Sequence, residues 1–199
     1  MNKIACVAGV LALTCAAHAD DLDLRAPMRL GYVYTHITRA PEVSVAWGAE
    51  ADVTHISKNL TFQLVLDVDT STRPELPDSD PVSAFTLLAV GAGLHFVSDG
   101  NVALGFSVTS GITFDAAQLV GGGFAVRAYV YPFYLRIEEL TGSPQRFTTL
   151  VASSLAMWLM GRVEWTGDGN GATVGFGVSL DLVRFFILPY VDALKKKFR

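Results

Sequence analysis

Cysteine and lysine are scarce in this 199-residue chain, and their scarcity excludes several kinds of protein. Both cysteines, Cys6 and Cys15, lie near the start, so residues 20–199 offer no disulfide, thiolate nucleophile or cysteine metal ligand. No lysine occurs between Lys58 and Lys195. Charged residues make up 17% of the chain and hydrophobic residues 51%. This composition excludes a disordered chain and is unusual for a protein whose whole surface faces water.

The N-terminal segment, residues 1–19, has the features of a secretory signal peptide. Lys3 supplies a positive start, an apolar stretch follows, and Ala17-His18-Ala19 fits the pattern that signal peptidase cleaves. The alternative is a buried N-terminal helix. We predict a signal peptide that is removed at about Ala19. Its removal takes away one base and no acid, so the remainder is more negative than the −4 of the whole chain, which argues against nucleic acid as a partner.

Alternation of apolar and polar residues dominates the rest of the chain. From Val43 to Val53 every second residue is apolar, and a period of two is the signature of a β-strand. Sequences such as Ser98-Asp99-Gly100-Asn101 are typical of tight turns between strands. The strands recur at spacings of roughly twenty residues, which leaves no room for crossover helices, so neighbouring strands should be antiparallel. We predict eight strands, over residues 28–38, 43–54, 60–70, 85–97, 102–114, 122–136, 149–165 and 171–184.

Two of these strands have ambiguous sequences. Pro132 cannot donate a hydrogen bond to a sheet, so we expect a bulge or a strand break within 122–136. Residues 147–161 can also be interpreted as a buried helix, because the length of an apolar run does not distinguish the two structures.

The size of the side chains on the polar face distinguishes a soluble barrel from a membrane barrel. Small residues such as Gly91 and Gly105 occupy that face, whereas large ones such as Leu64, Phe106 and Phe176 occupy the other. Small residues fit the narrow interior of an eight-stranded barrel, and a soluble barrel would need many long charged side chains outside. We therefore predict an all-β fold, an eight-stranded antiparallel up-and-down transmembrane β-barrel over residues 20–186, with a basic C-terminal tail over 187–199. A soluble lipocalin-like barrel is the alternative.

This architecture resembles the small outer-membrane β-barrels of Gram-negative bacteria, such as the OmpA transmembrane domain and OmpX. The resemblance covers about residues 27–186, and Gly175 to Phe185 is similar to the last-strand signal that barrel-assembly machinery reads. That signal usually ends a chain, whereas fourteen residues follow Phe185 here. The resemblance implies a monomer in the cell outer membrane, surrounded by lipid and lipopolysaccharide, with both termini in the periplasm and with the assembly machinery as a partner during biogenesis.

With that strand direction, alternation places two layers of charge inside the barrel. We expect Arg29 to lie between acids of the periplasmic layer, because buried charges must be paired. Four aromatic residues, Tyr129, Tyr131, Phe133 and Trp158, also face inward and are expected to plug the lumen. The periplasmic layer comprises Arg29, Glu50, Asp52 and Asp181, with His95 at a similar depth, and the outer layer comprises Asp67, Asp69, Arg127, Arg162 and Glu164.

Several functions are compatible with such a lumen. It can be a polar core that fills the barrel, a narrow ion path, or a pocket for an apolar ligand. We expect no catalytic residue, cofactor or metal site, because His36, His55 and His95 lack a neighbouring nucleophile and a partner histidine at strand spacing. The prediction is an outer-membrane protein with a plugged lumen and a structural or interaction role in the cell envelope. The alternatives are a porin-like small pore or carrier for apolar ligands, and a lipid-modifying barrel enzyme.

Overall fold

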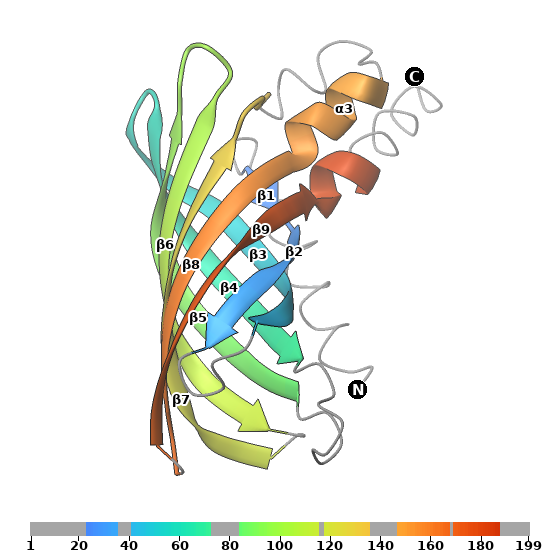
Figure 1. Cartoon of the computed structure of the whole chain (residues 1–199). Helices are drawn as coiled ribbons and strands as arrows, with labels where there is room; N and C mark the ends of the chain where they lie inside the picture. Colours follow the sequence, from blue (N-terminus) through green and yellow to red (C-terminus); the bar gives the residue numbers. More distant parts are fainter. Residues whose placement is uncertain are drawn as a thin grey trace.

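The described residues form an antiparallel sheet that closes on itself (Figure 1). The structure is a computed structural model and describes residues 23–35, 41–72, 84–115, 118–135, 147–167 and 169–187. Its strands are β1 (Leu24–Arg25), β2 (Pro27–Thr35), β3 (Pro41–Ser57), β4 (Leu60–Thr72), β5 (Ala84–Val97), β6 (Ala103–Asp115), β7 (Gln118–Tyr131), β8 (Leu155–Thr166) and β9 (Gly169–Asp181).

Closure of the sheet leaves none of the strands β2 to β9 at an open edge. Each pairs with the next along the chain, and β9 pairs with β2 from Pro27↔Asp181 to Thr35↔Thr173. The short β1 pairs with β3 and continues the line of β2, so the ring has eight members. Because an open edge would leave backbone groups without hydrogen bonds in lipid, closure is what a membrane requires. The predicted up-and-down antiparallel barrel is confirmed.

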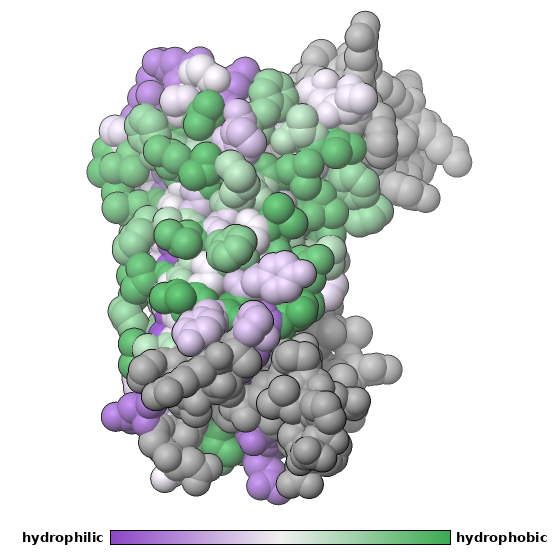
Figure 2. All heavy atoms as spheres, in the orientation of Figure 1, coloured by the Kyte–Doolittle hydropathy of each residue, from purple (hydrophilic) through white to green (hydrophobic). Residues whose placement is uncertain are grey.

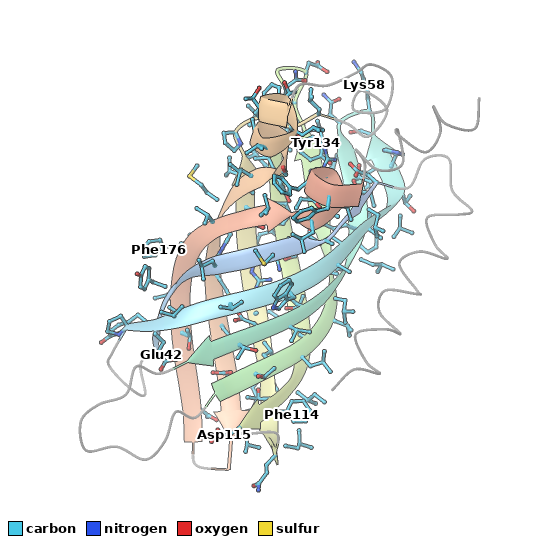
Figure 3. The ribbon with its side chains drawn as sticks, turned by 90° about the vertical axis from the view of Figure 1, so that its right-hand side faces the viewer. Glu42, Lys58, Phe114, Asp115, Tyr134 and Phe176 are labelled. Atoms are coloured by element: carbon cyan, nitrogen blue, oxygen red, sulfur yellow. The ribbon has the colours of Figure 1, made fainter. Side chains whose placement is uncertain are left out.

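The barrel wall is apolar outside and polar inside. Leu159 and Phe176 are each 62% exposed, whereas Arg29 and Arg127 are each 2% exposed. Hydrophobic residues cover the wall between its two ends (Figure 2), and Phe176 projects away from it (Figure 3). A large apolar surface is unfavourable in water and favourable in hydrocarbon. The distribution is that of a transmembrane barrel, and it is the reverse of a lipocalin-like one.

The chain departs from the predicted strands at one end of the barrel. β7 ends at Tyr131, directly before Pro132, where a break was expected. Residues predicted to begin the next strand instead form α3 (Phe147–Ser154), so the helical interpretation is correct for that part of 147–161. Among the residues described, none of the helices has the length and hydropathy to cross a bilayer.

The last strand is also shorter than predicted. β9 ends at Asp181, and a π-helix, η1 (Val183–Ile187), follows it. The Asp181 carboxylate explains the change of direction, because it accepts the backbone N–H groups of Val183 at 3.0 Å and Ala26 at 3.1 Å. η1 lies beside α3 at one end of the barrel (Figure 1), which we call the α3 end.

Two predicted segments lie outside the described residues. They are the signal peptide over 1–19 and nearly all of the basic tail over 187–199. Both stay predictions from the sequence.

Arginine substitutions at two depths test which solvent the wall faces. Leu159→Arg, in mid-wall, is expected to lower the free energy of unfolding by about 2–4 kcal/mol, because the guanidinium would enter hydrocarbon. Ile56→Arg, beside the β3–β4 turn, should cost at most ~1 kcal/mol, since headgroups and water are within reach. Urea unfolding in phospholipid vesicles measures both values. Equally small costs would mean that the wall faces water.

Candidate functional site

A row of ion pairs begins near the middle of the lumen. Arg29 on β2 forms ion pairs with Glu50 on β3 and, at 2.7 Å, with Asp67 on β4. Arg127 reaches Asp67 from β7 and lies 3.5 Å from Asp69. Since β4 and β7 are not neighbours in the sheet, Arg127 connects two distant parts of the wall across the lumen.

The row continues toward the end opposite α3. Arg162 on β8 lies 3.6 Å from Asp69 and 3.3 Å from Glu164. Asp69 also accepts a hydrogen bond from the Ser44 hydroxyl at 2.8 Å. The Nε and Nη1 atoms of Arg162 make no hydrogen bond with good geometry. This end of the row is therefore held by charge attraction more than by directed hydrogen bonds.

Toward the α3 end the row continues through Arg25 of β1. Its Nη2 lies 2.5 Å from an Asp52 oxygen and donates to Gln63 at 2.7 Å, while its Nε lies 3.3 Å from Glu50. His95 stands between the two charges, with Nδ1 3.0 Å from Asp52 and Nε2 2.9 Å from Arg25. Arg25 Nη1 also lies 2.5 Å from Nδ1, so the imidazole contacts the guanidinium through both ring nitrogens and Asp52 through Nδ1.

Signs alternate along the whole row, and its side chains are buried. Each arginine lies between two carboxylates, which is the arrangement that compensates the cost of removing charges from water. The two acids belong to different strands for Arg29 and Arg162, and to a single strand for Arg25 and Arg127. We call this row the charge ladder; its members are Asp52, Arg25, Glu50, Arg29, Asp67, Arg127, Asp69, Arg162 and Glu164.

A second polar cluster lies at the α3 end, and we call it the latch. Arg184 of η1 donates to the Leu135 carbonyl and forms ion pairs with Asp23 at 3.0 Å and Asp181 at 3.1 Å. Its guanidinium carbon lies 4.0 Å from the centre of the Tyr134 ring, and the Tyr134 hydroxyl donates to Asp23. The latch thus joins the chain before β1, after β7 and after β9.

Neighbouring charges and burial shift the pKa of Asp23, the latch carboxylate bound by Arg184 and Tyr134, in opposite directions. Partial burial would raise the pKa of Asp23, but the guanidinium groups of Arg184 and Arg25, together with the Tyr134 hydrogen bond, hold it below the usual value of 3.8. Burial raises the pKa of Tyr134 well above its ordinary range, so its hydroxyl stays a donor. Asp23 is therefore ionised at neutral pH and holds Arg184.

An aromatic cluster lies in the lumen beside the ladder. Tyr129, Tyr131, Tyr134 and Trp158 are all buried. Ring centres lie 5.7 Å apart for Tyr129 and Tyr131 and 5.3 Å apart for Tyr131 and Tyr134, both near edge-to-face. Tyr129 also donates to Gln63 at 2.8 Å, which joins the cluster to the ladder. Figure 3 shows Tyr134 at the α3 end.

Two expected positions differ in the structure. Phe133 is only half-buried and lies outside the aromatic cluster, and Tyr134 occupies the place expected for it. The reason is that β7 ends at Tyr131 and the bend at Pro132 interrupts the alternation. Asp181 belongs to the latch through Arg184 and not to Arg29, whose second acid is Asp67.

Sequence reasoning missed Arg25 and Arg184. Arg25 has the same parity as Arg29, so extending the first predicted strand toward the N-terminus would have found it. The alternation pattern could not have identified Arg184, because this residue reaches the latch from the helical turn η1 and not from a strand.

The histidines show no arrangement typical of catalysis among the described residues. His55 is exposed and lies 3.4 Å from the Thr61 hydroxyl, and His95 is part of the ladder region. His36 lies outside the described ranges. No group of metal-ligating side chains is found within those ranges.

Removing Arg29 tests the ladder. Arg29→Ala is expected to lower the free energy of unfolding by about 3–5 kcal/mol, because it leaves Glu50 and Asp67 buried with fewer partners. Lys58→Ala is the matched control, since Lys58 and Asp99 form an ion pair 81% and 77% exposed, and it should change stability by less than ~1 kcal/mol. Urea unfolding in vesicles compares the two. Equal losses would show that the ladder contributes no more than a surface pair.

A pH series tests the latch. Asp23→Asn is expected to cost ~2 kcal/mol of unfolding free energy at neutral pH, since Arg184 loses a charged partner. Because folding lowers the pKa of Asp23, its contribution is full above the ordinary carboxyl pKa and disappears as the pH falls through the lowered value. The difference between wild type and variant should therefore vanish in strong acid. If the difference in unfolding free energy between wild type and Asp23→Asn stayed the same at every pH, the charge of Asp23 would not contribute to stability. Asp99→Asn is the control at an exposed carboxylate.

Comparison with known proteins finds similarity to solved structures, two of which are described below. No protein-family model and no curated protein matches the chain. The chain is similar to Ail, the attachment invasion locus protein of Yersinia pestis, with 9% identity, a TM-score of 0.42, and coverage of 79% of this chain and 97% of that one. It is also similar to Neisserial surface protein A, with 12% identity, a TM-score of 0.44, and coverage of 80% and 96%. Neither likeness assigns an activity to this chain.

Proposed function

We propose that this protein is a non-conducting β-barrel of the outer membrane, with a structural or interaction role in the cell envelope. The observation that carries the proposal is the set of buried side chains that project into the lumen. The charge ladder crosses the lumen, the aromatic cluster lies beside the ladder, and the latch joins three segments of the chain at the α3 end. All ladder side chains are buried. A barrel of this kind is a rigid body in the bilayer rather than a channel.

The outer wall and the closed sheet support the membrane location. A belt of exposed apolar side chains surrounds a cylinder without open edges, the form in which strands cross an outer membrane. In this proposal outer-membrane lipid and lipopolysaccharide surround the wall, barrel-assembly machinery inserts it, and the α3 end faces the periplasm. The signal peptide predicted over 1–19 would direct export.

Arg127 and the buried tyrosines obstruct the lumen at successive depths along β7, which opposes conduction. An ion path needs a continuous wet connection through the lumen. The arginines of the ladder reach between distant strands, and the buried tyrosines fill the space nearer the α3 end. A lumenal carrier for apolar ligands would meet the same obstruction. Both alternatives are therefore less well supported than a filled barrel.

Conductance in planar bilayers tests the proposal. Wild-type protein should give no stable steps. Tyr129→Ala with Tyr131→Ala, or Arg127→Ala alone, should also give none, because one obstruction remains in each case. Only the triple variant is expected to conduct, since it truncates both obstructions.

The controls separate opening from damage. Val126→Ala with Val130→Ala truncates neighbouring side chains of the same strand that do not face the lumen and should stay silent. Heat-modifiable migration on gels confirms that each variant has folded. Stable steps from the wild type would contradict the filled lumen. Altered lipid A or phospholipid acylation in a deletion strain would instead support the enzyme alternative.

A further inference from the structure

A groove interrupts the outer wall at the seam where the first and last strands close the barrel. Its volume is about 590 Å³. We call it the seam groove. Two rows of three outward side chains border it, and these six side chains are 41% to 62% exposed. One row is Leu30, Val178 and Met157, and the other is Tyr32, Phe176 and Val43.

Paired glycines lie behind the groove, at lumen-facing positions of the wall. Gly31 and Gly177 face each other in the β2–β9 register, between the two rows. A Cβ on Gly31 would lie 2.4 Å from the Trp158 ring, and one on Gly177 would lie 2.1 Å from the Leu30 carbonyl oxygen. Only glycine permits this close approach on the lumen side. Between the two outward rows, the backbone of β2 and β9 forms the floor of the groove. Trp158 packs behind Gly31, and its Nε1 donates to the Val178 carbonyl at 3.0 Å, which fixes the floor.

The groove is continuous with the lipid-facing wall and has no charged lining residue. Gly31 is the central residue of the nine-residue β2, so the groove lies at mid-height of the seam. On β8 and β9 it is nearer the α3 end, since Met157 is two residues after the start of β8 and Val178 three before the end of β9. At this depth the surrounding solvent is hydrocarbon, and apart from the Tyr32 hydroxyl the outward side chains of the lining offer only apolar contact.

The spacing of the rows selects a slender occupant. The rows are two residues apart along each strand, which is about 6.4–6.8 Å. An α-helix with its side chains is about 10–12 Å across and would rest on the rows without entering between them. A polymethylene chain is thin enough to enter. A volume of this size also falls in the range of small-molecule sites, about 300–1,000 Å³.

We propose that the seam groove binds one acyl chain of a membrane phospholipid from the leaflet at the α3 end. The bound chain contacts the floor over Gly31 and Gly177 and fills the space between the two rows. This site goes beyond a generally apolar wall, because one position around the barrel holds lipid in preference to the others. It rests on the proposed membrane location.

Photocrosslinking in vesicles tests the site. The full chain is placed in phosphatidylcholine vesicles that contain some phosphatidylcholine with a diazirine in the middle of an acyl chain. The labelling of each residue is divided by its exposed area. The resulting value should be at least about fourfold higher at Leu30, Phe176 and Val178 than at Val90 on the far wall. Fourfold is the ratio of affinities that burial of one additional methylene group gives. Val178→Trp, which fills the groove, should remove the excess, and Val90→Trp should not.

Each other outcome overturns the inference in a distinguishable way. Labelling that follows exposure evenly around the barrel would mean ordinary lipid contact without a site. Labelling at Val90 with none at the groove would mean that another protein surface, such as a second copy, covers it. No labelling of either wall would mean that the chain is not in the bilayer, and the proposed function would fail with it.

Discussion

Arg29 is the point on which the interior depends, because it holds Glu50 and Asp67 from two other strands in one buried contact. Hydrocarbon outside the wall offers no compensation for a charge, so the carboxylates and guanidinium groups within the barrel must neutralise one another. Arg127 extends the same solution across the lumen to β7. The ladder thus ties non-adjacent strands together, which the backbone hydrogen bonds of a cylinder cannot do. An empty cylinder of this size would be held by its sheet alone.

The latch and the aromatic cluster complete this interior at the α3 end. Arg184 brings the segment after β9 against Asp23 and Leu135. In the proposed non-conducting barrel, the outer wall is the larger accessible surface of the described part. It is there that the structure offers a distinct feature, the seam groove, and its floor depends on Trp158 from inside. The Trp158 side chain therefore connects the packing inside the lumen with the floor of the seam groove on the lipid-facing side.

The sequence predicts which face each strand residue occupies, because a period of two leaves only two choices for a whole strand. Leu64 and Phe106 are exposed and Asp67 and Arg127 buried for this reason. Pairing partners are harder to predict, since they depend on the stagger between strands, which alternation does not encode. Arg29 was expected beside Asp181, yet its second acid is Asp67.

The remaining differences arise where strands end. Pro132 interrupts the alternation, so Tyr134 and not Phe133 joins the aromatic cluster. The apolar residues of α3 fit a helix or a strand equally well when considered alone. Arg184 lies beyond β9 in a turn whose direction is fixed by Asp181. These features depend on contacts between distant segments, which local patterns cannot reveal.

The most direct test of a lipid-facing wall around a filled lumen is nitroxide scanning of β8 in vesicles. Labels at Met157, Leu159 and Val163 should be relaxed strongly by oxygen and weakly by a water-soluble nickel complex, as expected in hydrocarbon. Labels at Ala156, Met160 and Arg162 should be accessible to neither reagent, because their neighbours exclude both. A period of two between these responses would support the account. Access of the nickel complex to the inward positions would contradict a filled lumen, and its access to the outward positions would contradict a membrane barrel.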